Sequence, residues 1–105
     1  MHKREHFSAV LKKGTCRVFF FGGYYFHPDS KEDKMFDDLL MLNLKLMNFV
    51  QIDSKNNPEA RCHHTAVMRG WDMFVYGGCS ISNYLRKVFD DIYKINLSLD
   101  SDYIW

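Results

Sequence analysis

The sequence has no excess of charge of either sign, no long hydrophobic run and no closely spaced pair of cysteines. Fourteen Lys and Arg side chains against thirteen Asp and Glu give a formal net charge of +1 at pH 7. Nucleic-acid-binding domains usually carry a basic excess or stripe, so we expect no nucleic-acid partner. The longest apolar runs, such as 18–21 and 39–42, are far shorter than the ~20 residues that cross a bilayer, and we expect no membrane association.

The three cysteines, Cys16, Cys62 and Cys79, cannot all pair within the chain and show no C-x-x-C spacing. No apolar segment typical of a signal peptide follows the polar N-terminus, and we therefore expect a cytoplasmic protein with free thiols. The sequence also contains no phosphate-binding loop, no H-E-x-x-H motif and no recognisable Ser-His-Asp set. We expect no catalysis by this chain and no cofactor.

What the sequence does contain is an internal repeat. Phe-Gly-Gly at 21–23 returns as Tyr-Gly-Gly at 76–78, and Phe-Asp-Asp-Leu at 36–39 returns as Phe-Asp-Asp-Ile at 89–92. The glycine pairs are 55 positions apart and the Phe-Asp-Asp triplets 53. A recurrence near 50 residues built from short β-like runs is typical of repeat architectures in which each copy is one sheet. The polar run 53–58 separates a first copy, residues 1–55, from a second copy, residues 56–105.

Each copy is predicted to contain four β-strands. In the first copy they are 6–11, 17–21, 39–44 and 48–52, and in the second they are 63–68, 73–76, 92–97 and 102–105. The second strand of each copy is almost entirely apolar, which indicates that its sheet is covered on both faces. A helix over the Leu-rich stretch 38–46 is an alternative, but the β-branched and aromatic residues of its counterpart 92–95 favour a strand. The joins 24–35 and 79–88 differ in length and sequence and are expected to be variable loops.

The residues at matching positions of the two copies resemble the kelch repeat. The family pattern has an Arg and a His with Ser or Thr at the first strand, Gly-Gly after the second, an acidic residue before the third and an aromatic residue on the fourth. In the second copy these places hold Arg61, His64, Thr65, Gly77, Gly78, Asp91 and Trp105. In the first copy they hold Arg4, Phe7, Ser8, Gly22, Gly23, Asp38 and Phe49. Phe7 and Phe49 depart from the usual His and Trp but preserve bulk.

The resemblance covers nearly the whole chain and implies two four-stranded antiparallel blades of a β-propeller. Kelch propellers close with about five to seven blades, within the general range of four to eight. Two blades leave the ring open and apolar sheet faces uncovered. We therefore expect a fragment of a larger propeller, a short gene product, or a chain whose exposed faces are covered by further blades or by copies of itself. The closing aromatics and the glycine pairs are expected to pack against each other.

Two groups of residues have the chemistry of a reactive site but are better explained by structure. Cys62 and His64 could share one face of a strand, with Cys79 as a third soft ligand, but the usual zinc-ligand spacing is missing and no metal is expected. The pairs Asp37-Asp38 and Asp90-Asp91 are carboxylates of the kind used in acid–base catalysis. Because they recur once per copy, we expect a shared structural role in which they accept backbone N–H groups.

The segments that follow the glycine pairs are the best candidates for binding. In several kelch propellers the corresponding residues line the rim that faces the partner. The candidate partner-binding residues are Tyr24, Tyr25, His27, Asn83, Tyr84 and Arg86, because Tyr and Arg are favoured anchors at protein interfaces. We expect a protein–protein interaction module. Two alternatives stay open: part of a larger enzyme with a kelch propeller, acting on sugars or linked to a phosphatase, and a structural subunit that assembles into a ring.

Overall fold

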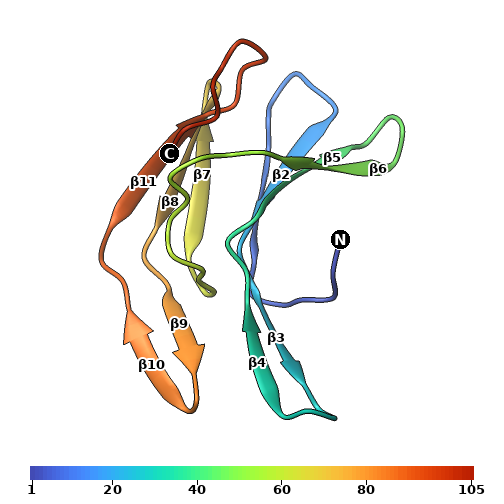
Figure 1. The fold of residues 1–105 in the computed structure, drawn as a ribbon. Coiled ribbons are helices and arrows are strands. Elements are labelled where there is room, and N and C mark those ends of the chain that lie inside the picture. Colours follow the sequence, from blue (N-terminus) through green and yellow to red (C-terminus); the bar gives the residue numbers. More distant parts are fainter.

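The computed structural model describes all residues from 1 to 105 and contains eleven β-strands and no helix, so the all-β prediction is confirmed (Figure 1). No helix is therefore present that could cross a membrane. The strands are β1 (Ser8–Leu11), β2 (Arg17–Phe21), β3 (Tyr24–His27), β4 (Glu32–Met35), β5 (Leu39–Asn43), β6 (Asn48–Ile52), β7 (Thr65–Arg69), β8 (Asp72–Tyr76), β9 (Cys79–Ser82), β10 (Leu85–Val88) and β11 (Ile92–Asn96).

The first copy forms a four-stranded antiparallel sheet in the order β1-β2-β5-β6. Its four strands fall where the sequence predicts them, although β1 begins at Ser8 rather than at residue 6. The Leu-rich stretch is the strand β5, and the helical alternative for it is wrong. Leu40 and Leu42 of β5 lie on one face of this sheet and Leu39 and Met41 on the other, because successive side chains alternate along a strand.

The second copy forms a sheet of three strands, in the order β11-β8-β7, and the predicted fourth strand over 102–105 does not join it. A turn closed by the Ser101 N–H on the Ser98 carbonyl, 3.0 Å, directs the chain away from β11. The tail crosses instead to the segment that follows β6, where Ile104 and Lys55 form an isolated parallel bridge. The Trp105 N–H donates to the Lys55 carbonyl at 3.0 Å.

The two joins after the glycine pairs, expected as variable loops, are β-hairpins. β3 pairs with β4, with Tyr24 opposite Met35, and β9 pairs with β10, with Cys79 opposite Val88. Figure 1 shows both hairpins extending from the same end of the two larger sheets, and β4 contacts β9. Each copy therefore sends one hairpin out in the same direction.

The core lies between the two larger sheets, which pack face to face. The first sheet contributes Phe19, Phe21 and Leu39, and the second contributes Met73, Val75, Ile95 and Leu97, all at most 2% exposed. The Trp105 ring lies 5.0 Å from the ring of Phe21, beside the first glycine pair, whereas Phe49 packs on Phe20 of its own sheet at 5.6 Å. Burial of these apolar side chains supplies most of the force that holds the copies together.

Candidate interaction site between the two hairpins

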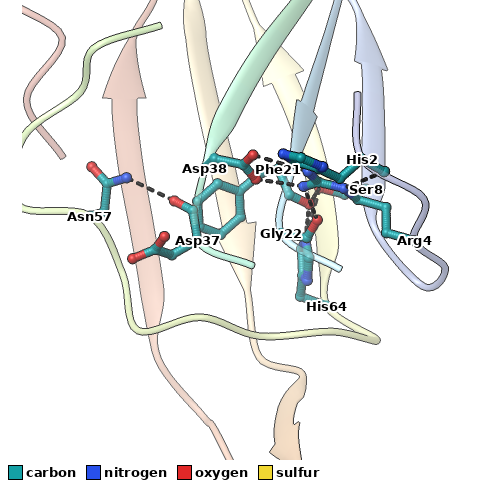
Figure 2. Close-up of polar contacts among 9 residues, drawn as sticks. All are labelled: His2, Arg4, Ser8, Phe21, Gly22, Asp37, Asp38, Asn57 and His64. Carbon is teal, nitrogen blue, oxygen red and sulfur yellow. Dashed lines mark hydrogen bonds and ion pairs between the residues drawn. The ribbon is translucent and has the colours of Figure 1, made fainter. Parts of the chain in front are cut away.

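The hairpins are held to the sheets by an arginine that recurs in both copies. In the first copy the Arg4 guanidinium donates to both carboxylate oxygens of Asp38, at 2.5 and 3.0 Å, and to the Gly22 carbonyl at 3.1 Å (Figure 2). In the second copy Arg61 donates to Asp91 at 2.5 and 3.1 Å and to the Gly77 carbonyl at 3.0 Å. The same contact thus fixes the start of each hairpin relative to the strand that follows it.

Each guanidinium also lies over the phenylalanine of its Phe-Asp-Asp motif. The Arg4 Cζ is 3.7 Å from the centre of the Phe36 ring, and the Arg61 Cζ is 4.0 Å from that of Phe89. The Arg61 side chain is fully buried. Its hydrogen bonds hold the pKa of Asp91 below the ordinary value, so this carboxylate stays charged.

The structural role expected for the aspartate pairs is therefore filled by the second aspartate of each pair, but its partner is an arginine and not the backbone N–H groups that we expected. The first aspartate is exposed; in Asp37 the backbone carbonyl accepts from the Asn57 side chain at 2.7 Å. Arg4 and Arg61 are the residues that the sequence argument left without a role. Their matched positions, 57 apart, were the signal that could have identified them.

Of the side chains considered as zinc ligands, His64 takes part in the joint between the copies, whereas Cys62 and Cys79 contact each other within the second copy. His64 Nε2 lies 2.8 Å from the Ser8 hydroxyl and 3.1 Å from the Phe21 carbonyl of the first copy (Figure 2). Burial lowers the pKa of His64 to about 4, so the ring is neutral at pH 7. The Sγ atoms of Cys62 and Cys79 are 3.9 Å apart, and burial, reinforced by the neighbouring thiol, raises the pKa of Cys62 to about 12. The three side chains do not form a cluster that could hold a metal ion.

A cleft of about 440 Å³ lies between the two hairpins and brings together three of the six predicted binding residues. Tyr24 lies on the first hairpin, and Asn83 and Tyr84 lie on the second. The remaining lining side chains were not predicted: they are Phe26, Lys31, Glu32, Asp33, Ile81 and Ser82. We call this space the hairpin cleft. It mixes aromatic, apolar, amide and charged groups within one concave surface.

The tyrosine at the tip of the second hairpin, Tyr84, is almost fully exposed to solvent. Asn83 and Tyr84 join β9 to β10 and both have positive φ, 51° and 66°, as the tight turns of two-residue hairpins require. Tyrosine rarely adopts this conformation, and the Tyr84 side chain is 97% exposed. A bulky aromatic that is almost fully exposed in a strained turn is poorly explained by folding alone.

The wall formed by the first hairpin contains a side-chain hydrogen bond between its two strands. The Tyr24 hydroxyl donates to Asp33 Oδ1 across the strand pair at 2.5 Å. This hydrogen bond, with burial and the Asp33 charge adding to it, raises the pKa of Tyr24 to about 12. The phenol is a protonated donor to Asp33, and its ring lines the hairpin cleft.

The other three predicted binding residues lie elsewhere. Tyr25 and His27 alternate with Tyr24 and Phe26 along β3, so they face a separate open pocket of about 630 Å³. Their rings meet edge to face at 4.8 Å. Arg86 is exposed on β10 and does not line the hairpin cleft. Because the segment was expected to be a loop, the alternation of faces that divides these residues could not be anticipated.

Comparison with known proteins gives a likeness of fold. No family model matches the chain. A solved structure described as that of YjhT is similar to it with a TM-score of 0.60 and 21% identical residues, over 73% of this chain. The chain spans about a fifth, 21%, of the length of that protein. At this identity the likeness shows that the two share an arrangement of strands, and this arrangement is what the comparison establishes for the chain.

Proposed function

We propose that the chain is a pair of kelch-type repeats, two blades of a β-propeller, that binds a protein partner through the hairpin cleft. The repeated Arg, Gly-Gly and Asp positions of the sequence support the repeat assignment, since the same three groups contact one another in both copies. Segments that project from a rigid repeated frame are where binding is most often found.

The observation that carries the binding proposal is the placement of Tyr84 opposite Tyr24 and Phe26 across one cleft. Aromatic side chains provide large contact areas at small entropic cost, and tyrosine adds a directional hydrogen bond. The hydroxyl and amide groups of Ser82 and Asn83 lie on the same surface. An extended peptide or loop with one apolar side chain, inserted between the hairpins, matches this combination of aromatic, apolar and polar groups.

The charges of the two hairpins give the partner a direction. The first hairpin carries Asp29, Glu32 and Asp33 against two lysines, and the second carries Arg86 and Lys87 with no acidic residue. A partner with a basic group near the first hairpin and an acidic group near the second complements both. Such charges act chiefly on the association rate and on the choice of partner.

The binding proposal is favoured over an enzymatic one by what the reactive residues do. In the repeated aspartate pairs, Asp38 and Asp91 are bound to buried arginines, and His64 is hydrogen-bonded within the joint. The hairpin cleft itself contains no histidine or cysteine, and its one hydroxyl–carboxylate pair, Tyr24 and Asp33, is a contact within the first hairpin. Recognition needs only the aromatic and polar groups that are present.

A photo-reactive amino acid placed at residue 84 tests the proposal. In extracts of the native cell it is expected to capture one partner, and purified partner should bind the chain and lose at least tenfold in affinity with Tyr84→Ala. Leu99→Ala is the matched control, because Leu99 is also largely exposed, at 73%, but lies outside the cleft. The proposal would be contradicted if both variants bound the partner equally. It would also be contradicted if a photo-reactive amino acid at residue 99 of this chain captured the same partner protein.

A further inference from the structure

Besides the apolar core and the two backbone hydrogen bonds between Lys55 and the C-terminal tail, three backbone hydrogen bonds join the two copies. The Gly23 N–H donates to the Arg61 carbonyl at 2.8 Å, and the Arg61 N–H donates to the Phe36 carbonyl at 3.3 Å. The His63 N–H donates to the His6 carbonyl at 3.0 Å. The start of the second copy is therefore bonded to the glycine pair and the Phe-Asp-Asp motif of the first.

The matching groups on the far side of the second copy have no hydrogen-bond partner. They are the Gly78 N–H, the Phe89 carbonyl and the His63 carbonyl, which correspond to Gly23, Phe36 and His6. At the other end of the molecule the N–H and carbonyl of Arg4 and the N–H of His6 are also unpaired. These are the counterparts of the Arg61 and His63 groups that make the joint. The two ends thus present complementary donors and acceptors.

The side chains of the far face follow the same pattern. In the first copy Ser8, Phe21 and Leu39 form a row across the sheet, and the second copy covers them to 8%, 1% and 0% exposure. The matching row of the second copy is Thr65, Tyr76 and Ile92.

That second row is open. Tyr76 is 53% and Ile92 68% exposed, and Val67 beside them is 61% exposed. We call this surface, centred on β7, β8 and β11, the outer face of the second copy. Its apolar side chains have no cover within the chain.

The first copy presents the complement of that surface. The residues of the second copy that pack into the core, Met73, Val75 and Ile95, correspond to Val18, Phe20 and Leu42 of the first. These three lie on the face of the first sheet that points away from the core and are only half-buried. We call this surface, with Leu11 at its edge, the outer face of the first copy.

We propose that the outer face of the second copy binds the outer face of the first copy in another molecule of this chain, reproducing between molecules the joint that exists within each. The surfaces are different, so the contact is head to tail and leads to a closed ring or an open filament. This inference does not depend on the hairpin cleft, which is formed at a different end of the sheets.

The glycines show that room for such a neighbour is present. A Cβ at Gly22 would lie 2.6 Å from the Arg61 carbonyl oxygen of the second copy, whereas a Cβ at Gly77 meets only the Phe89 carbonyl, at 3.4 Å. Arg61 and His64 of the second copy therefore occupy the space beside Gly22, whereas no other copy occupies the matching space beside Gly77. In the proposed contact Phe7, the counterpart of His64, fills it without the hydrogen bonds that His64 makes.

Light scattering behind a sizing column, with two complementary variants, tests the proposal. Ile92→Lys places a charge on the outer face of the second copy, and Leu42→Lys places one on that of the first. The unmodified chain is expected to grow in mass with concentration, and each variant alone to remain at 12.5 kDa. An equimolar mixture should form one-to-one dimers, because each variant keeps one intact face.

Leu46→Lys is the matched control, because Leu46 is as exposed as Ile92, at 68%, but lies in the β5–β6 turn. The Leu46→Lys chain should self-associate as the unmodified chain does. If Leu42→Lys does not fold, Leu11→Lys on the exposed edge of the same face replaces it. A monomeric unmodified chain at all concentrations, association that survives Ile92→Lys, or a mixture that stays monomeric would overturn the proposal. Tyr84→Ala should leave the mass unchanged, which separates this test from that of the hairpin cleft.

Discussion

The two copies make the same internal contacts, but the matching sheet face is covered in the first copy and exposed in the second. The bonds from arginine to the glycine carbonyl are 3.1 Å in the first copy and 3.0 Å in the second. Yet Phe21 is 1% exposed and its counterpart Tyr76 is 53% exposed. The partly buried Met41 of the first copy likewise corresponds to the exposed Lys94. The residue types within the motif are thus the same in both copies, because each copy makes the same internal contacts. The residue types on the sheet faces differ, because each face has a different neighbour.

A second difference lies at the place held by His64 in one copy and Phe7 in the other. His64 crosses to Ser8 and Phe21 of the first copy. Phe7 packs on Phe20 of its own copy, with ring centres 5.6 Å apart. The polar side chain occurs at the joint between the copies, and the apolar one packs within its own copy.

The largest effect is expected from removing a buried arginine. Arg61→Ala should destabilise the chain by about 3–5 kcal/mol, because it empties a fully buried site and removes the donor to Asp91 and to the Gly77 carbonyl. Arg4→Ala tests whether the matching contact between Arg4 and Asp38 stabilises the first copy by a similar amount. Denaturant unfolding at one fixed protein concentration measures both. Asp90→Ala is the control, since this exposed neighbour of Asp91 has no partner, and a loss as large as that of Arg61→Ala would contradict the assignment.

The glycines that begin the hairpins are expected to come next. Gly22 and Gly77 both have φ near 70°, so an alanine at either costs about 1–2 kcal/mol in backbone strain. Gly22→Ala should lose roughly 1–3 kcal/mol more through overpacking against Arg61 and His64 of the second copy. Equal melting of the two alanine variants would mean that the second copy does not lie against Gly22.

Acid should weaken the joint through His64. Its pKa is about 4 in the folded chain and 6.5 ordinarily, so only the unfolded state takes up the proton between these values. Stability is therefore complete above pH 6.5 and falls as the pH drops toward 4, by up to about 3 kcal/mol. His64→Phe, which copies the first repeat, should be less stable at pH 7 but nearly flat across this window. An unchanged pH profile in that variant would contradict the role given to His64.

The smallest effect is expected at the tip of the second hairpin. Tyr84→Gly should raise the stability by about 1 kcal/mol, because glycine adopts a positive φ without strain. The same change should weaken binding of a partner in the hairpin cleft. Thermal melting and a titration with that partner measure the two effects. A loss of stability on this change would mean that the Tyr84 ring has a structural contact.

The sequence was sufficient for the features that depend on local pattern. The glycine pairs, the apolar strand β2 and the alternation around Ile95 predicted an all-β fold and the four-stranded first sheet. The sequence was not sufficient for contacts between residues that are far apart in the chain. The tail pairs with Lys55, far from it in sequence, rather than with β11. The aspartates meet Arg4 and Arg61 from 34 and 30 positions away, and nothing local marks that pairing.

The candidate site was predicted in part for the same reason. Tyr24 and Tyr84 could be selected by residue type and by their position after the glycines. That Tyr25 and His27 face away from the cleft depends on the pairing of β3 with β4, which the turn 28–31 closes without a strong hairpin signature. The contribution of Phe26 and Ile81 depends on the contact between the two hairpins, which only the packed sheets produce.

Amide hydrogen exchange at Gly78 tests most directly the claim that the joint between the copies is a repeatable contact. Isotope-labelled Leu42→Lys chain, with its second-copy face intact, is measured alone and with excess unlabelled Ile92→Lys chain. The Gly23 amide, already bonded to Arg61, should be protected in both samples. The Gly78 amide should exchange rapidly alone and become protected in the mixture. Rapid exchange of Gly78 in both samples would show that the joint occurs only once, within the chain.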